Sequence, residues 1–74
     1  MTNLEFELWL RDNRVFGIDD MLTKTRVYYY EPNPWTKPIE LLTVTEETFS
    51  EPNAQRYILV YLKQKVEEAN QYIR

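Results

Sequence analysis

A helical period in the last third of the sequence constrains this chain more than any other feature. Apolar residues recur there at spacings of three and four, which is the spacing of one face of an amphipathic helix. The residues are Ala54, Ile58, Leu62, Val66, Ala69 and Ile73, and three tyrosines widen the same arc: Tyr57, Tyr61 and Tyr72. The pattern predicts one long helix that runs to the C-terminus, whose apolar face the rest of the chain has to cover.

The residues just before this period have the composition of a helix start. Ser50 is followed by Glu51 and Pro52. Proline is tolerated in the first turn of a helix, where its missing N–H costs no hydrogen bond. We therefore expect Ser50 to be the N-terminal cap of the long helix.

Two segments in the middle of the chain have the composition of β-strands. Residues 25–31 are rich in β-branched and aromatic side chains, and Pro32 ends the run. A loop over residues 32–38, stiffened by three prolines, leads to a second such segment at residues 39–45. Both segments are predicted to be strands.

A shorter strand is predicted nearer the N-terminus. Asp12 and Asn13 supply turn chemistry, and the chain then returns through three apolar residues: Val15, Phe16 and Ile18. Gly17, inside this return, marks a bulge or a close backbone approach. Beyond it, Asp19 and Asp20 are expected to begin a single helical turn, because acidic groups are favoured near a helix N-terminus.

The first segment, residues 4–10, fits two interpretations. Four apolar residues alternate with polar or aromatic ones, which is the two-residue period of a half-buried strand: Leu4, Phe6, Leu8 and Leu10. Against this, Thr2 and Glu5 have the spacing of a capping box, and Leu4 and Leu8 lie one helical turn apart. We favour the strand, while the helix stays open.

These elements predict one α+β domain over residues 1–74: a small antiparallel sheet of three or four strands with one long C-terminal amphipathic helix packed across one face. A core of this size contributes little net stability. The sequence contains no Cys and no His, so neither a disulfide nor a zinc–thiolate cluster adds to it. Packing of the six Tyr, three Phe and two Trp, or association with a partner or a second copy, has to supply the rest.

The same residue types argue against catalysis. A Ser–His or Cys–His nucleophile is impossible without His and Cys, and Ser50 is the only serine. The adjacent acidic residues Asp19 and Asp20 match no calcium-loop spacing. A chain this small barely walls a cleft that holds two carboxylates in different environments. We predict a protein that is not an enzyme and that takes no cofactor or metal ion.

The aromatic residues instead indicate binding of another protein. The pleat of residues 25–31 places Val27 and Tyr29 on one face, and we expect this face to pack under the helix. A two-layer domain leaves the far side of its sheet uncovered, so large rings there form an exposed patch of the kind that binds partners. The predicted partner surface consists of Arg26, Tyr28, Tyr30, Trp35 and Lys37. The predicted function is that of an adaptor, an accessory subunit or an inhibitor of a larger protein.

Three alternatives stay open. Trp35 either presents itself to the partner or folds back onto the sheet as a latch. The chain either stays a monomer or self-associates through the wide arc of the long helix, around Tyr57, Val60 and Tyr61. The tyrosines either contact protein or stack with the bases of a single-stranded nucleic acid, although the formal charge of −3 opposes binding to phosphates.

The sequence also bears on location. No apolar run approaches the roughly 18 residues that a membrane helix requires. Residues 4–10 contain two glutamates and lack the basic flank of a signal peptide. We therefore expect a soluble cytoplasmic protein with no membrane partner.

Overall fold

The structure of the chain is a computed structural model that describes the backbone of residues 2–73 and the side chains of residues 2–71. Within these residues the elements are α1 (Asn3–Asp12), β1 (Val15–Asp20), β2 (Thr25–Tyr30), β3 (Ile39–Thr45), α2 (Glu46–Phe49) and α3 (Ala54–Ile73). The strands form one antiparallel sheet in the order β1-β2-β3. The predicted α+β fold, with a small sheet and a long C-terminal helix, is confirmed.

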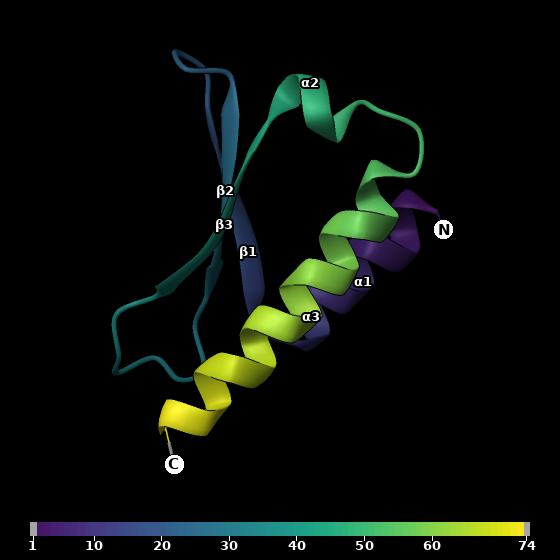
Figure 1. Cartoon of the computed structure of the whole chain (residues 1–74). Coiled ribbons are helices and arrows are strands. Elements are labelled where there is room, and N and C mark those ends of the chain that lie inside the picture. Colours follow the sequence, from purple (N-terminus) through teal and green to yellow (C-terminus); the bar gives the residue numbers. More distant parts are fainter. Residues whose placement is uncertain (1, 74) are drawn as a thin grey trace.

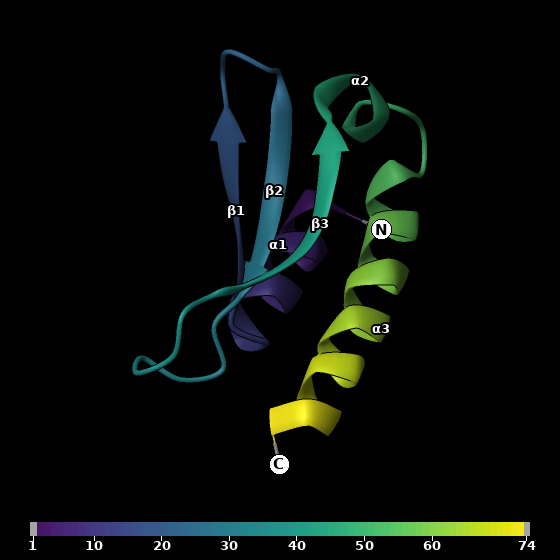
Figure 2. The same ribbon diagram turned by 60° about the vertical axis from the view of Figure 1, so that its left-hand side comes forward.

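The helices α1 and α3 lie on the same side of the sheet (Figure 1). α1 contacts β1, α3 contacts β3, and the two helices contact each other. In a view turned by 60°, the three strands lie side by side, and α3 runs beside β3 at the edge of the sheet (Figure 2). The fold therefore has two layers, and among residues 2–73 no helix covers the opposite face of the sheet.

The prediction that residues 4–10 form a strand is wrong, because the segment is the helix α1. The capping box is complete: the Glu5 N–H donates to the Thr2 hydroxyl at 3.1 Å, and the Thr2 N–H donates to the Glu5 carboxylate at 3.4 Å. Phe6 and Leu10, one turn apart, are buried, while Leu4 is 67% exposed. Only half of the alternating apolar residues face the core, which suits a helix better than a strand.

The short strand predicted around Val15, Phe16 and Ile18 is confirmed as β1. Its continuation is different from the prediction, since Asp19 and Asp20 end β1 and begin no helical turn. The Asp20 carboxylate accepts hydrogen bonds from the N–H groups of residues 22 and 23, at 3.0 and 3.3 Å, and so closes the turn to β2. An aspartate is favoured here because its side chain bonds to the backbone two residues on.

Acidification is expected to loosen this turn. Hydrogen bonds from the backbone of Leu22 and Thr23 lower the pKa of the Asp20 carboxyl from its ordinary value of 3.8. The stability that they contribute is present above 3.8 and is lost as the pH falls through the lowered value. An NMR titration of the carboxyl carbon should place the midpoint for Asp20 below 3.8. In Asp20→Asn the acid-induced shift of the Leu22 amide should disappear, and a midpoint at or above 3.8 would contradict the assignment.

Gly17 marks a close approach, but to a ring rather than to a backbone. It pairs with Tyr28 across the sheet, and a Cβ atom at this position would lie 3.0 Å from the Cε1 atom of the Tyr28 ring. The irregularity of the sheet is elsewhere: the β2–β3 register shifts between Tyr28 and Tyr29, opposite Leu41. Because of this bulge, the neighbouring residues Leu41 and Leu42 both contribute to the core.

The predicted strand at residues 39–45 is confirmed as β3, and the short helix α2 follows it without having been predicted. The Thr45 hydroxyl caps α2 by accepting a hydrogen bond from the Thr48 N–H at 3.1 Å. Ser50 ends the same helix, and its hydroxyl donates to the Glu46 carbonyl at 2.8 Å. The expectation that Ser50 caps the long helix is therefore wrong, because α3 begins only at Ala54.

The apolar face predicted for the long helix is confirmed where its side chains are described. Ala54, Ile58 and Leu62 are buried, and Val66 and Ala69 pack against them half-buried. Tyr72 and Ile73 lie outside the described side chains. α3 contributes one more buried core residue, Leu59. The others come from α1 and the three strands: Phe6, Leu10, Val15, Tyr28, Tyr30, Leu41 and Val44.

Candidate interaction surface

The predicted partner surface depends on which way the tyrosines of β2 point. Tyr28 is 1% exposed and Tyr30 is 7% exposed, so the expectation that these two rings are exposed is wrong. The Phe6 ring meets the Tyr28 ring edge-on, with the centroids 6.1 Å apart. The Tyr30 hydroxyl donates to the Asn70 side chain of α3 at 2.7 Å. Both rings therefore belong to the face that packs under the helices.

Arg26 belongs to the same face, and its side chain interacts with other residues of the chain. Its guanidinium forms an ion pair with Asp19 at 2.6 Å and lies 4.0 Å above the centre of the Phe49 ring. The Tyr28 hydroxyl lies at the limit of hydrogen bonding, 3.5 Å from the same guanidinium. Burial raises the pKa of the Tyr28 phenol. This cluster closes one end of the core, so Arg26 does not stand on an open surface as predicted.

The uncovered side of the sheet carries a different set of side chains. The residues that alternate with the buried ones on β1 and β2 form what we call the outer face: Phe16, Ile18, Val27 and Tyr29. Phe16 and Tyr29 are cross-strand partners whose rings stack with centroids 5.5 Å apart. Ile18 is 53% exposed, and the other three are half-buried. The expectation that Val27 and Tyr29 pack under the helix is wrong, since the helices lie on the other side (Figure 1).

Apolar side chains also stand at both ends of the outer face. Met21 and Leu22, in the turn between β1 and β2, are 79% and 96% exposed. Trp35, in the loop at residues 31–38, is 87% exposed, which excludes the latch. The turn and the loop both bend away from the helices, toward the side of the outer face (Figure 1). The outer face thus lies between two projecting apolar segments.

The loop that presents Trp35 is held by local hydrogen bonds. The Asn33 side-chain oxygen accepts from the N–H groups of Trp35 and Thr36, both at 3.0 Å. Three prolines in the same loop fix further backbone angles. Lys37 is exposed two residues after Trp35, as predicted for a surface position. An exposed ring on a pre-ordered loop loses little conformational entropy when it docks.

The self-association surface predicted on α3 is solvent-accessible. Tyr57, Val60 and Tyr61 are 72%, 64% and 42% exposed. Tyr57 and Tyr61 border a groove between α3 and β3, whereas Val60 does not line it. The Lys65 ammonium lies 5.3 Å from the centre of the Tyr61 ring. This side of α3 is separate from the outer face of the sheet.

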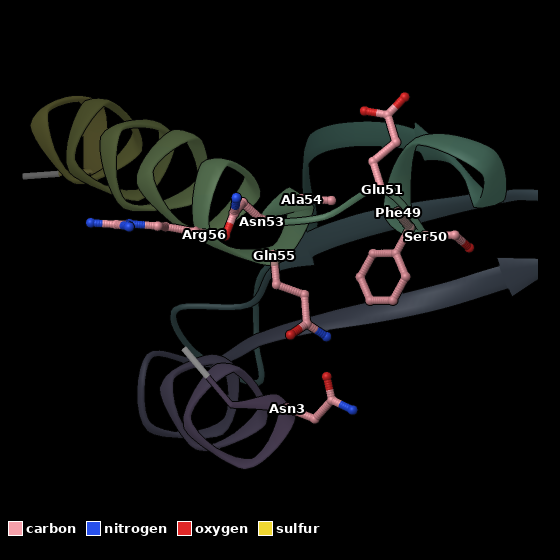
Figure 3. A pocket seen from close by; sticks show the side chains of 8 residues that line it. All are labelled: Asn3, Phe49, Ser50, Glu51, Asn53, Ala54, Gln55 and Arg56. Carbon is pink, nitrogen blue, oxygen red and sulfur yellow. The ribbon is translucent and has the colours of Figure 1, made fainter.

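A polar hollow lies where the start of α1, the end of α2 and the start of α3 meet (Figure 3). Its volume is about 350 Å³, and its polar lining is one carboxylate, one guanidinium, three amides and a hydroxyl: Glu51, Arg56, Asn3, Asn53, Gln55 and Ser50. One carboxylate supplies no acid–base pair. Within the part of the chain that the structure describes, no group of three Asp or Glu residues is placed to hold a metal ion.

Comparison with known proteins reveals no relative of this chain. No protein-family model matches the sequence, and no curated protein or solved structure matches it significantly. Among the described residues, no helix is both long enough and apolar enough to cross a membrane. A function for this chain therefore has to be inferred from the surfaces described above.

The sequence pattern missed four residues of this surface: Phe16, Ile18, Met21 and Leu22. For Phe16 and Ile18, one signal was available in Gly17. A glycine inside an apolar strand leaves room for a large side chain opposite it. The side of the strand that carries Gly17 is then the packed side, and the neighbouring residues Phe16 and Ile18 face outward.

Proposed function

We propose that this chain is a protein–protein interaction module, which acts as an adaptor, an accessory subunit or an inhibitor of a larger protein, and that it binds its partner through the outer face. The observation that carries the proposal is an apolar sheet face with no covering layer among the described residues. Phe16, Ile18, Val27 and Tyr29 leave apolar surface in contact with water there, between the exposed side chains of Leu22 and Trp35. Contiguous patches of this kind mark interaction sites.

The charges around the outer face support a protein partner over a nucleic acid. The residues that share this side of the sheet with the apolar four are Asp20, Thr25, Glu40, Thr43 and Thr45, of which only the two acids are charged. The affinity of a protein for the phosphates of a nucleic acid comes mainly from Lys and Arg. The tyrosine platform predicted for single strands also loses its basis, because Tyr28 and Tyr30 are buried. We therefore keep nucleic acid only as an outcome of the test.

Ile18→Asp is expected to abolish partner binding while the domain stays folded. The side chain is 53% exposed, so a charge there remains hydrated in the free protein but is desolvated in the complex. Affinity purification from nuclease-treated lysate should recover a partner with the wild-type chain, and recovery should fall about tenfold or more with Ile18→Asp. Trp35→Ala should weaken the same interaction.

Val60→Asp is the matched control. Val60 is somewhat more exposed than Ile18 but lies on α3, away from the outer face, so its variant should recover the partner as the wild type does. Equal recovery with Ile18→Asp and wild type would contradict the proposal. If recovery depends on nucleic acid that the nuclease removes, the alternative function is correct instead.

Self-association through Tyr57, Val60 and Tyr61 is a second form of the proposal. Sedimentation velocity across micromolar concentrations distinguishes it from binding to another protein. A dimer that Val60→Asp dissociates would place the contact on α3. A dimer that Ile18→Asp dissociates would place it on the outer face.

A further inference from the structure

A different surface lies along the edge of the sheet that β3 forms. Within residues 2–73, β3 pairs only with β2. The Glu46 N–H donates to the Lys24 carbonyl at 2.9 Å and extends the β2–β3 ladder in register. Because successive residues of a strand direct their N–H and C=O groups to opposite sides, Val44 also faces β2, whereas Thr43 faces away from the sheet. The main-chain groups of Thr43 are thus available to a further strand.

A groove runs beside this edge, between β3 and α3, with a volume of about 320 Å³. Its lining includes Leu42, Val44 and Ile58, and Tyr57 and Tyr61 border it on α3. Figure 2 shows α3 running along the β3 side of the sheet. An extended segment hydrogen-bonded to β3 would direct alternate side chains toward this groove, since side chains alternate along a strand.

We propose that this edge and its groove bind an extended segment of another protein, which adds to β3 as a fourth strand. The segment would have apolar residues at alternate positions, to fill the groove, and basic residues at its ends. Strand addition of this kind gains affinity from main-chain hydrogen bonds and specificity from the side-chain pockets beside them. The regular edge extends from position 42 to position 45, because the bulge at Leu41 interrupts it.

The acidic charge of this edge decides the chemistry of the occupant. Residues 39–49 contain Glu40, Glu46 and Glu47 but no Lys or Arg. Basic residues at the ends of a bound segment would lie opposite these carboxylates. A second copy is unfavourable, because antiparallel pairing of two β3 strands about Thr43 would set Glu40 of one opposite Glu46 of the other. Like charges directly across a sheet are destabilising.

This proposal goes beyond the function proposed above, because it uses a different surface. The test uses two fluorescein-labelled peptides, Lys-Val-Thr-Val-Thr-Val-Lys and Glu-Val-Thr-Val-Thr-Val-Glu, and fluorescence anisotropy with the full chain. The lysine peptide should bind, and the glutamate peptide should bind at least about tenfold more weakly. Absence of binding by the lysine peptide up to about 1 mM protein would overturn the proposal, as would equal binding of the two.

Thr43→Pro tests the role of the edge. Proline removes an N–H that faces away from the sheet, so the β2–β3 ladder keeps its hydrogen bonds. Affinity for the lysine peptide should fall about tenfold or more. Thr43→Val is the matched control, because it keeps the N–H and the side-chain shape and should bind as the wild type does. Equal affinity of the proline and valine variants would overturn strand addition.

A third measurement needs no variant of β3. In NMR titrations of the wild-type chain, the lysine peptide should shift the amides of Thr43 and Thr45, and not that of Gly17 on the opposite edge. Tyr57→Ser should weaken binding and Val60→Ser should not, because Tyr57 lines the groove and Val60 does not. Ile18→Asp should leave peptide binding unchanged, which separates this site from the outer face. A wild-type dimer that Thr43→Pro dissociates would identify a second copy as the occupant and overturn the proposal.

Discussion

Replacing Phe6 with alanine is expected to cost about 3–5 kcal/mol of unfolding free energy. Phe6 is 0% exposed, and its ring meets the rings of Tyr28 and Phe49 edge-on, each at a centroid distance of 6.1 Å. One side chain of α1 thereby packs against β2 and α2. A small domain has only roughly 5–15 kcal/mol in total, so Phe6→Ala removes a large share of its stability. Urea unfolding followed by far-UV circular dichroism measures the loss.

Leu4→Ala is the control on the same helix. Leu4 is 67% exposed, so its truncation should change the unfolding free energy by no more than about 0.5 kcal/mol. If Phe6→Ala costs as little as Leu4→Ala, α1 does not pack against the sheet in the way described. In that case the face of the sheet under the helices is open as well, and the outer face is no longer the one uncovered face available to a partner.

The sequence predicted best those elements whose pattern admits one interpretation. The long helix keeps its period over twenty residues, so its existence and its buried face are predicted correctly, although α3 begins at Ala54 and not directly after Ser50. The strand at residues 39–45 is set off by Pro38 before it, and β3 has the same bounds. These local signals coincide with the tertiary packing, since Ile58 and Leu62 are buried where the period places them.

Residues 4–10 show why a short apolar alternation is not decisive. In a helix, residues that alternate in sequence fall on different faces, whereas those three or four apart share one. Phe6 and Leu10 share the buried face, and Leu4 and Leu8 share the exposed one. The capping box at Thr2 was the local signal that favoured the helix, and it is formed. Packing against β1 and α3 supports the helix, although the alternation had favoured the strand.

The faces of β2 could not be assigned from its own composition, because rings occur on both. The deciding features belong to other elements. Gly17 on β1 has no side chain and so leaves room for the Tyr28 ring. Asn70 on α3 accepts a hydrogen bond from the Tyr30 hydroxyl. Such pairings depend on strand register and helix position, which residues 25–31 do not specify. Among the described residues no helix covers one apolar face of the sheet, but this face carries Phe16, Ile18, Val27 and Tyr29.

Tyr28→Ala and Tyr29→Ala should therefore differ sharply, although the two residues are neighbours. Tyr28 is 1% exposed and fills the core beneath the helices, so its truncation should cost about 3–5 kcal/mol. Tyr29 is half-buried and stacks on Phe16 across the outer face, so its truncation should cost roughly 1–2 kcal/mol. Urea unfolding of both variants under one set of conditions makes the comparison.

The order of these two losses decides which face of the sheet is free to bind. A large loss for Tyr28→Ala with a small one for Tyr29→Ala means that the Tyr29 ring is held mainly by neighbours on an open face, where a partner can cover it. Tyr29→Ala should then reduce the recovery of the partner even though the domain stays folded. If instead Tyr29→Ala is the more destabilising variant, the two faces are exchanged, and Tyr28, Tyr30 and Arg26 become the partner surface that the pleat of β2 first indicated.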